Sequence, residues 1–442
     1  MPAPSPLSTA PRALMAVLCG VLLAWSSGCQ SYHKRTELAF ADYERGQFAS
    51  AAQQYADPKT TDSPFLRGAE AGMSALSGGD FAGARQHFEF AAEAVRQIER
   101  TALADPQALG EKILSWAVND TLLTYEGEGY ERALLHSARA IAHLMSGDLE
   151  GARVEVRQAN ALLESEETLY KKEYRAGGLG HFLSGVTYEL AGRPDDAYID
   201  YKRLEKKDLG RDLYAPALAR LARELGNDED LLLWQQRYSL EAKQVDGLAN
   251  IVVLAAVGTG PYKYETALAV PLPEGIVQWA VPSFARRPQT VDAVQLLVEG
   301  VDAPIQTVVL EDVGRVAKEN LDDRLAWLAA KSAVRTMLKY QLTRELGRDH
   351  GALGTIAGIL FTVITERADL RCWMTLPDTW QAARLFLPAG EWPLRVRAGG
   401  LSADLGRFDL ASGETMFVFV RTLGAQIHAY HVGGRLKEAA KP

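Results

Sequence analysis

The stretch "YERGQFASAAQQY", residues 43–55, decides the fold that this sequence predicts. Gly46 follows a helix-forming run, and glycine readily adopts the positive φ that ends the first helix of a pair. Phe48 and Ala51 open the next helical run, in which a small residue such as alanine lets the second helix pack closely on the first. The stretch therefore predicts a helical hairpin.

The same pattern recurs along the first half of the chain. It reads "LSGGDFAGARQHF" (76–88), "LMSGDLEGARVEV" (144–156), "LAGRPDDAYIDY" (190–201) and, more weakly, "ELGNDEDLLLWQQRY" (224–238). The turn glycines are spaced 33, 68, 45 and 34 residues apart. Two intervals match the tetratricopeptide (TPR) period of about 34 residues, one is twice that period, and one contains an insertion. Helix pairs of this kind stack into a superhelix with one concave side, and other α-hairpin arrays fit the same pattern.

The composition changes near residue 247, after which β-branched residues, glycine and proline increase. Short apolar runs separated by turn residues predict strands there. In "QAARLFLP", residues 381–388, the apolar side chains alternate with Arg384 and Phe386, as in a strand with one buried face. The predicted strands are "ANIVVLAAV", "YETALAV", "TVDAVQLLV", "PIQTVVL", "QAARLFLP", "ETMFVFVRT" and "AQIHAYHV".

Between residues 311 and 366 the pattern becomes helical. An apolar stripe at helical spacing begins at Val316, and a second helix is expected over 353–366. The second helix holds Gly354 and Gly358, a spacing that lets helices approach closely. We expect this hairpin to be buried against the strands, because short apolar helices usually belong to a core. Contact with a membrane or a partner is the alternative.

These patterns predict a two-domain α+β chain. An N-terminal α-solenoid of TPR-like helical hairpins is expected over residues 37–246, and a β-sandwich-like domain over 247–432. The helical insertion divides the second domain at about 311–366, and residues 433–442 are expected to form a flexible tail.

The start of the chain reads as a secretory signal. The apolar block Ala13–Trp25 follows Arg12 and spans 13 residues, whereas a membrane-spanning helix needs about 20. Residues 26–29, Ser-Ser-Gly-Cys, resemble a bacterial lipobox, although that pattern prefers leucine where Ser26 stands. The resemblance implies cleavage after residue 28, acylation of Cys29, and a lipidated tether over 29–36. An ordinary secretory signal is the alternative.

Gln30 follows this cysteine where lipoproteins kept in the inner membrane often have aspartate. The lipobox resemblance therefore implies the outer membrane, with the protein facing the periplasm. Only Cys372 then remains as a thiol, and a small buried apolar role is expected for it. The chain has a formal charge of −8 and no basic run, which argues against nucleic acid as a partner.

One stretch, "NDTLLTYEGEGYERALLHSARAIAHL" from residue 119, gathers acids, tyrosines and histidines. Carboxylates with an imidazole could bind metal or perform acid–base chemistry. Acids in the first turn of a well-capped helix explain the same residues structurally, and no nucleophile or third spaced ligand accompanies them. We therefore predict a partner-binding surface on the concave groove, with no catalytic residue, metal or cofactor. Its candidate residues are Tyr125, Glu126, Glu128, Tyr130, Glu131 and His136.

The glycine-rich stretch "AAVGTGPYKYE" does not match a nucleotide-binding motif. Gly258 and Gly260 lack the further glycine, lysine and hydroxyl residue of a phosphate loop and do not open a helix. A turn between two strands is expected there. For Trp373, Trp380 and Trp392, roles in a core or an interface are expected over a ligand pocket.

Two stretches resemble a known family. "YEGEGYERALLHSARAIAHLMSGDLEGARVEVRQA" and "ITERADLRCWMTLPDTWQAARLFLPAGEWPLRV" are similar to those of a largely uncharacterised family of bacterial TPR-containing outer-membrane lipoproteins. Genes of that family often lie beside lipoproteins similar to the curli secretion channel and to penicillin-binding-protein activators. The resemblance implies an accessory or assembly role at the envelope. Cys372 stands where the family pattern has serine, so no role is carried over from that serine.

The leading functional hypothesis is a lipid-anchored scaffold or adaptor whose groove binds a protein or peptide partner in envelope or secretion-system assembly. Neighbouring lipoproteins are possible partners, and acyl chains on Cys29 would hold the protein to the membrane. A second hypothesis is an enzyme or polymer-binding protein acting on envelope glycan, with Glu126, Glu131 and His136 as reactive groups. A third is a structural subunit of an export assembly.

Overall fold

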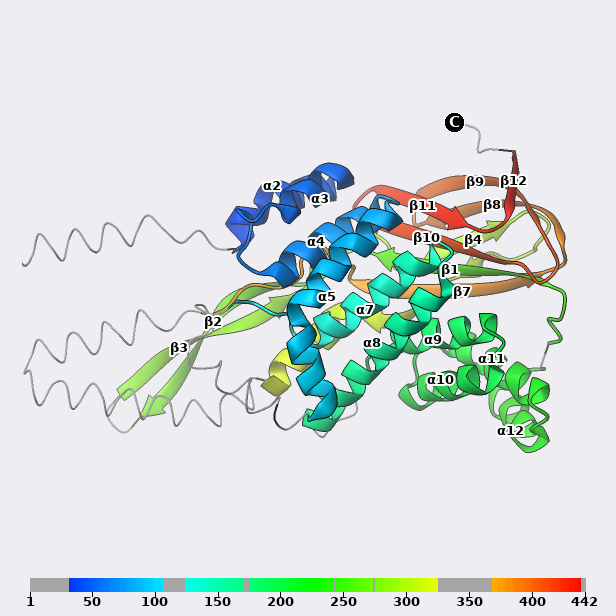
Figure 1. Cartoon of the computed structure of the whole chain (residues 1–442), viewed down its shortest axis with the longest axis horizontal. Helices are drawn as coiled ribbons and strands as arrows, with labels where there is room; N and C mark the ends of the chain where they lie inside the picture. Colours follow the sequence, from blue (N-terminus) through cyan, green and yellow to red (C-terminus); the bar gives the residue numbers. More distant parts are fainter. Residues whose placement is uncertain are drawn as a thin grey trace, which may run out of the picture.

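The computed structural model describes residues 32–105, 108, 124–170, 175–241, 243–272, 275–324 and 368–438. It has a helical N-terminal region and a strand-rich C-terminal region, which confirms the α+β organisation (Figure 1). The predicted signal, Cys29 and the second inserted helix at 353–366 lie outside the described residues. Among the described helices, none has the length and apolar character needed to cross a bilayer.

The helices follow one another as antiparallel pairs, each packed on the next. Helix α2 begins at Tyr32, before the predicted start of the repeat region at residue 37. Residues 32–36 are therefore helical and do not belong to a tether. The described helices are α2 Tyr32–Glu44, α3 Phe48–Ala56, α4 Pro64–Ser77, α5 Phe81–Ala104, α7 Gly129–Leu144, α8 Leu149–Tyr170, α9 Gly178–Leu190, α10 Pro194–Lys207, α11 Arg211–Glu224, α12 Asp228–Tyr238 and a further helix over 313–324.

The predicted turn glycines do make the turns within these pairs. Each adopts a positive φ, between 66° and 77°, at the end of the first helix of its pair. This conformation costs little for glycine and is strained for residues with a Cβ. The glycines are Gly46, Gly79, Gly147, Gly192 and Gly226.

Alanine at two of these turns should have different effects on stability. At Gly147 a Cβ would meet no atom within 4 Å, so Gly147→Ala should cost about 1 kcal/mol through backbone strain alone. At Gly79 a Cβ would lie 2.4 Å from the Tyr430 ring of the strand region, so Gly79→Ala should cost about 1–3 kcal/mol more. Urea unfolding of both variants measures the difference. Equal losses would show that Tyr430 does not pack on this turn.

The strands form two five-stranded sheets and one separate hairpin. Sheet A has the order β11-β10-β1-β7-β6, and sheet C has the order β12-β9-β8-β4-β5. Strand β1 is parallel to β10 and antiparallel to β7. The bounds are β1 Ala249–Val257, β2 Tyr262–Leu272, β3 Gly275–Ala285, β4 Val294–Val298, β5 Ile305–Gln306, β6 Val308–Asp312, β7 Thr379–Leu387, β8 Gly390–Ala398, β9 Leu401–Leu410, β10 Thr415–Leu423, β11 Gln426–Val432 and β12 Arg435–Glu438.

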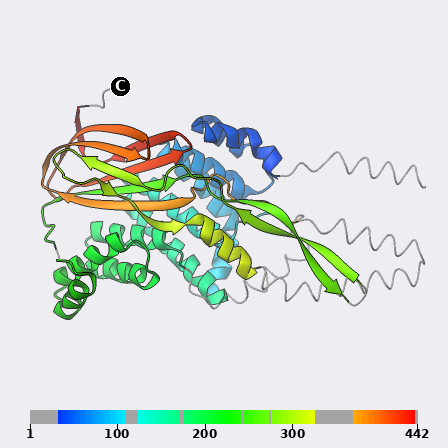
Figure 2. The ribbon, with the colours of Figure 1, turned by 180° about the vertical axis from the view of Figure 1, so that it is seen from behind.

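Sheet A is covered on both faces. Along β1, Ile251 and Val253 belong to the core shared with sheet C, whereas Val252 and Leu254 belong to the core shared with the helices. A strand buried on both sides needs an unbroken apolar run, which is what "ANIVVLAAV" supplies. Helices, sheet A and sheet C thus form three layers (Figures 1 and 2).

Two sequence predictions about the strands were wrong. Strand β7 was expected to bury one face, but Trp380 joins the helical core while Ala383 joins the core between the sheets. The helices cover the face that was assigned to solvent. The predicted flexible tail contains β12, which pairs with β9. The turn predicted at Gly258–Pro261 is confirmed, because it connects β1 to β2.

Candidate functional site

The predicted binding residues lie on α7 and on the loop before it, but they do not form an exposed surface. Glu128 and Glu131 make a capping box: the Glu128 side chain accepts from the backbone of Glu131, and the Glu128 N–H donates to Glu131 Oε2 at 2.9 Å. Glu126 is half-buried. Tyr125, Glu128, Tyr130, Glu131 and His136 are all buried. Of the six predicted partner-binding residues, only Glu126 is therefore partly accessible in this structure.

Another part of the same chain contacts these buried residues. Residues 369–378, here called the inner segment, run in a mostly irregular conformation between the helices and sheet A. The Trp373 N–H donates to Glu131 Oε1 at 2.8 Å. The next two N–H groups, of Met374 and Thr375, donate to the two oxygens of Glu70 at 2.7 and 2.9 Å. Two buried carboxylates thus hold three consecutive backbone groups.

Aromatic side chains enclose the middle of the inner segment. The Trp373 ring makes edge-on contacts with Phe65 of α4 and Phe88 of α5, at centroid distances of 6.2 and 6.0 Å. Its Nε1–H donates to Thr375 Oγ1 at 3.0 Å, and the Tyr43 hydroxyl donates to the Thr375 carbonyl at 2.9 Å. The inner face of the helices, which the sequence assigned to a partner, is therefore occupied by the chain itself.

Burial controls the acidity of the two carboxylates. It raises the pKa of Glu70 to about 7, even though the hydrogen bonds from Thr375, Met374 and Tyr32 act in the opposite direction. Burial likewise raises the pKa of Glu131. The side-chain oxygens of Glu70 and Glu131 each accept hydrogen bonds from N–H or O–H groups. These acids therefore hold the segment in place and have no free reactive oxygen.

Glu128 has the opposite environment. Burial alone would raise the pKa of Glu128, but Arg324 and Lys263, each 2.6 Å away, lower it to about 2. The ammonium of Lys263 also lies 5.5 Å from the centroids of the Tyr125 and Phe284 rings. This buried ion cluster joins the helix 313–324 and the base of β2 to the start of α7.

His136 bridges two acids on neighbouring helices. Its Nδ1 lies 2.6 Å from Glu155 on α8, and its Nε2 lies 3.1 Å from Glu99 on α5. Burial lowers the pKa of His136, but the hydrogen bonds to Glu155 and Glu99 outweigh it and the pKa is raised. Both ring nitrogens contact carboxylates, which favours the charged imidazole, and these contacts tie three helices together. The described residues contain no group of three His, Cys, Asp or Glu that could hold a metal ion.

Replacing His136 with glutamine should change how stability depends on pH. The raised pKa means that the folded protein binds a proton that the unfolded chain loses near pH 6.5. This contribution is fully present below pH 6.5 and is lost as the pH rises through the higher folded pKa. Glutamine cannot supply the charge, so His136→Gln should cost about 3–5 kcal/mol at pH 6 and flatten the fall in stability above pH 6.5.

Denaturant unfolding between pH 6 and 9 measures this effect. The control is His87→Gln, because His87 is half-buried and burial lowers its pKa, so that its pKa is shifted in the opposite direction from that of His136. If the free energy of unfolding falls equally steeply above pH 6.5 in the wild type and in His136→Gln, the assignment of a charged imidazole is contradicted.

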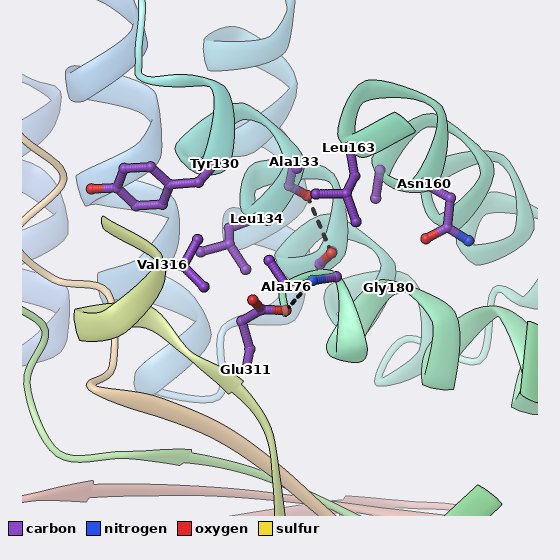
Figure 3. Close-up of a pocket in the computed structure, with 12 residues that line it drawn as sticks. Tyr130, Ala133, Leu134, Asn160, Leu163, Ala176, Gly180, Glu311 and Val316 are labelled. Atoms are coloured by element: carbon purple, nitrogen blue, oxygen red, sulfur yellow. Dashed lines mark hydrogen bonds between the residues drawn. The ribbon is translucent and has the colours of Figure 1, made fainter. Parts of the chain in front are cut away.

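The cavity beside these residues is small. Figure 3 shows Tyr130, Leu134, Asn160 and Glu311 around a space between α7, α8, α9 and the strand region. Its volume is about 20 Å³, enough for about one water molecule. Glu311 accepts the Gly177 N–H at 2.7 Å, and burial raises the pKa of Glu311 to about 7. The space is too small for an organic ligand.

A larger hollow of about 390 Å³ lies on sheet C. It is formed by β4, β8 and the turn after β4, with β9 at its edge. Charged side chains stand at its border, and Arg395 pairs with Asp404 at 3.4 Å. Sequence reasoning missed this hollow because its residues are spread over separate strands and form no local motif. The other charged residues that line it are Glu299 and Asp302.

Sequence reasoning also missed Glu70 and Glu189. Glu189 of α9 binds Arg384 of β7 through both oxygens, at 2.7 and 2.9 Å, and Arg220 of α11 at 2.7 Å. The available signal for Glu70 was its isolation, as the one acid in the apolar helix "PFLRGAEAGMSALS". An acid on the apolar side of a helix usually has a buried partner.

No protein-family model matches this chain, and no curated protein sequence matches it. The fold and the site therefore define only a class: a helical array whose inner face is closed by a β-sandwich and by the inner segment of the same chain.

Proposed function

We propose that the protein is a lipid-anchored scaffold or adaptor of the bacterial outer membrane, facing the periplasm, in envelope or secretion-system assembly. The observation that carries this proposal is how the buried acids are used. Glu70, Glu131 and Glu189 hold the strand region to the helices, and Glu128 holds Lys263. Glu131, a reactive group in the enzyme hypothesis, is thus bound to another part of the chain.

We further propose that the helical pairs are TPR-like. Support comes from the antiparallel pairing of consecutive helices and from the positive-φ glycine within each predicted hairpin. Buried alanines follow these turns at Ala51, Ala84, Ala152 and Ala197, where neighbouring helices approach closely. The resemblance to TPR-containing lipoproteins supports the same proposal.

The partner-binding surface is proposed on the outer side of the array, because the inner face is filled. Apolar side chains are exposed on the second helices of several pairs. Val154 on α8 is 54% exposed and Ile199 on α10 is 52% exposed. Leu232 and Leu233 are also exposed on α12, the last described helix of the array. Exposed apolar side chains on neighbouring elements commonly mark protein–protein contacts.

Photo-crosslinking in intact cells tests this proposal. Probes replace Val154 and Ile199, with a probe at Leu436 of β12 as an exposed control on the strand region. A scaffold should give the same specific protein adducts at Val154 and Ile199, absent at Leu436 and lost in Cys29→Ser. Metabolic labelling with a palmitate analogue, also lost in Cys29→Ser, checks the lipid anchor. Adducts that do not depend on Cys29, or no adducts, would contradict the anchored scaffold.

A second candidate function is binding of envelope glycan, as the sequence analysis also considered. The hollow on sheet C favours it, because it is open, of ligand size and bordered by charged side chains. Purified protein should then sediment with isolated cell-wall glycan, and Asp302→Ala should weaken this without changing the unfolding midpoint. If Asp302→Ala sediments with the glycan as well as the wild type does, the hollow is not the binding site.

A further inference from the structure

Strand β11 forms one edge of sheet A, and among the described residues no strand pairs with its outer side. Proteins usually protect such edges with very short strands, charged side chains, prolines or bulges. Strand β11 reads "QIHAYHV" and contains no charged residue, proline or glycine. It pairs with β10 over its whole length without a bulge. This edge therefore lacks the usual protection.

The other edges of the two five-stranded sheets are protected, as far as the structure describes them. Strand β6, at the opposite edge of sheet A, is bulged and contains Glu311 and Asp312. Strand β12, at one edge of sheet C, is also bulged and reads "RLKE". Strand β5, at the other edge, has only two residues. Strand β11 is thus the exception, and an unprotected edge is a template for pairing with another chain.

The turn before β11 determines which of its backbone groups point outward. Leu423 and Gln426 close a two-residue turn of Gly424 and Ala425, with Gly424 at a φ of 52°. In such a turn the Gln426 N–H donates to the Leu423 C=O, so the N–H of Gln426 points toward β10. Because the direction alternates along an antiparallel strand, every second residue directs its N–H and C=O to the open edge. These residues are Ile427, Ala429 and His431.

Side-chain contacts hold β11 in place on both faces of the sheet. Ile427 and Ala429 pack on the core between sheets A and C. On the other face, the Gln426 amide donates to the Glu44 carbonyl at 3.2 Å, and the Tyr430 hydroxyl donates to the end of α4 at 3.2 Å. The open backbone edge is therefore already positioned for a partner strand.

A second copy of β11, running antiparallel to the first, fits this edge. The outward-pointing residues are spaced symmetrically about Ala429. A two-fold axis at this position places Ala429 opposite its own copy and Ile427 opposite His431 of the copy. Every outward N–H and C=O group of β11 then has a partner. The side-chain faces match as well, because residues that face sheet C lie opposite each other.

Charge and neighbouring elements permit this pairing. Burial lowers the pKa of both His428 and His431, so both imidazoles are mostly uncharged at pH 7. The α2–α3 turn lies on the helix-facing side near Gln426, whereas β12 pairs with Phe408, whose ring contacts His431 on the sheet C side (Figure 1). Antiparallel pairing brings the turn of one copy and β12 of the other to the same end, on opposite faces. These elements therefore do not occupy the same space.

We propose that two copies of this chain pair antiparallel through β11 and join their A sheets into one continuous sheet. The interface is isologous, because each copy contributes the same strand. The two-fold axis is perpendicular to the joint sheet, so both helical arrays lie on the same side of it. This inference goes beyond the proposed scaffold function and does not depend on the lipid anchor.

Cysteine crosslinking tests the dimer and its register. The full chain carries Cys19→Ser and Cys29→Ser, which remove the proposed anchor and leave the buried Cys372 as the remaining native thiol. Opposed residues in a hydrogen-bonded pair have Cα atoms about 5.5 Å apart, which a disulfide can bridge. Mild oxidation of purified Ala429→Cys should therefore give a species of twice the chain mass of 48.3 kDa.

The matched control is Ile427→Cys, because position 427 lies four residues from its own copy in this register, roughly 14 Å away. It should give at least tenfold less crosslinked dimer than Ale429→Cys. Combining Ile427→Cys with His431→Cys should restore the crosslink, because these two positions face each other across the axis.

A proline at the axis tests the same pairing without a thiol. Ala429→Pro removes an outward N–H and leaves the bonds to β10 in place, so it should lower the dimer fraction in sedimentation velocity at least tenfold. An unchanged dimer fraction overturns the inference. So does the absence of a crosslink from Ala429→Cys, the result expected if a peptide or a segment outside the described residues occupies the edge. Equal crosslinking of Ala429→Cys and Ile427→Cys overturns it too, because it shows contact without this register.

Discussion

Replacing Glu70 with alanine should lower the free energy of unfolding by about 3–5 kcal/mol, because it leaves several buried donors without an acceptor. The carboxylate is fully buried on α4 and receives the N–H groups of Met374 and Thr375 and the Tyr32 hydroxyl, at 2.7, 2.9 and 2.8 Å. Water cannot reach these groups in the folded protein. The loss is measured by urea unfolding at pH 6.

The matched control is Glu93→Ala on α5, whose carboxylate is exposed and pairs with Arg96 at 2.8 Å. Exposed pairs contribute up to about 1 kcal/mol, so this variant should remain close to wild type. Glu70→Ala with a loss as small as that of Glu93→Ala would mean that α4 does not hold the inner segment.

The titration of Glu70 gives an independent readout. The folded pKa of Glu70, about 7, exceeds the ordinary glutamate pKa of 4.5, so the folded protein binds more protons between these values. The contribution is fully present below pH 4.5 and is lost as the pH rises to 7, on the order of 3 kcal/mol. Glu70→Gln does not titrate and should show a smaller fall in stability over this range. If the free energy of unfolding falls equally steeply with pH in the wild type and in Glu70→Gln, the raised pKa of Glu70 is contradicted.

Breaking the ion cluster around Glu189 should lower the free energy of unfolding by a similar amount. Glu189→Gln removes the charge that faces Arg384 and Arg220, whose side chains are only 10% and 12% exposed. Burial would raise the pKa of Glu189, but the two arginines lower it to about 2, so the carboxylate is charged in the wild type. Leaving two largely buried cations without this partner should cost about 3–5 kcal/mol, measured by urea unfolding at pH 7.

A double variant separates the cluster from simple loss of packing. Glu189→Leu combined with Arg384→Met removes both charges that join α9 to β7. The double variant should lose less stability than the sum of the losses of the two single variants. Arg395→Met on the exposed pair with Asp404 is the control, with an expected loss of up to about 1 kcal/mol. Strict additivity would contradict a direct interaction of Glu189 with Arg384.

The helical hairpins could be predicted because their signals are local. Gly79 and its neighbours lie within one turn, so backbone preference decides the conformation there. The second buried face of β7 could not be predicted, because it depends on helices that are distant in sequence. Strands β3 and β8 were missed; each contains a proline, Pro282 and Pro393, which usually argues against a strand. Strands β9 and β12 were missed as well.

The candidate site was located in part. Tyr125, Glu128, Tyr130 and Glu131 do gather in one place, as their spacing on a capped helix indicated. Their burial could not be deduced, because the covering Trp373 lies 242 residues after Glu131. Glu70 was missed for the same reason: its acceptor role depends on Met374, 304 residues away.

That separation of 304 residues has a consequence for how the protein is made. The chain emerges with its N-terminus first, so Glu70 is present before Met374 can reach it. Strand β1 likewise precedes its parallel neighbour β10, so the layer that covers the helices forms late. During this interval the apolar side chains that pack on Trp373, such as Phe65 and Phe88, lack that cover, so we expect holding chaperones to bind the unfinished chain. Chains cut short before residue 369 never gain this cover and should be cleared by proteases.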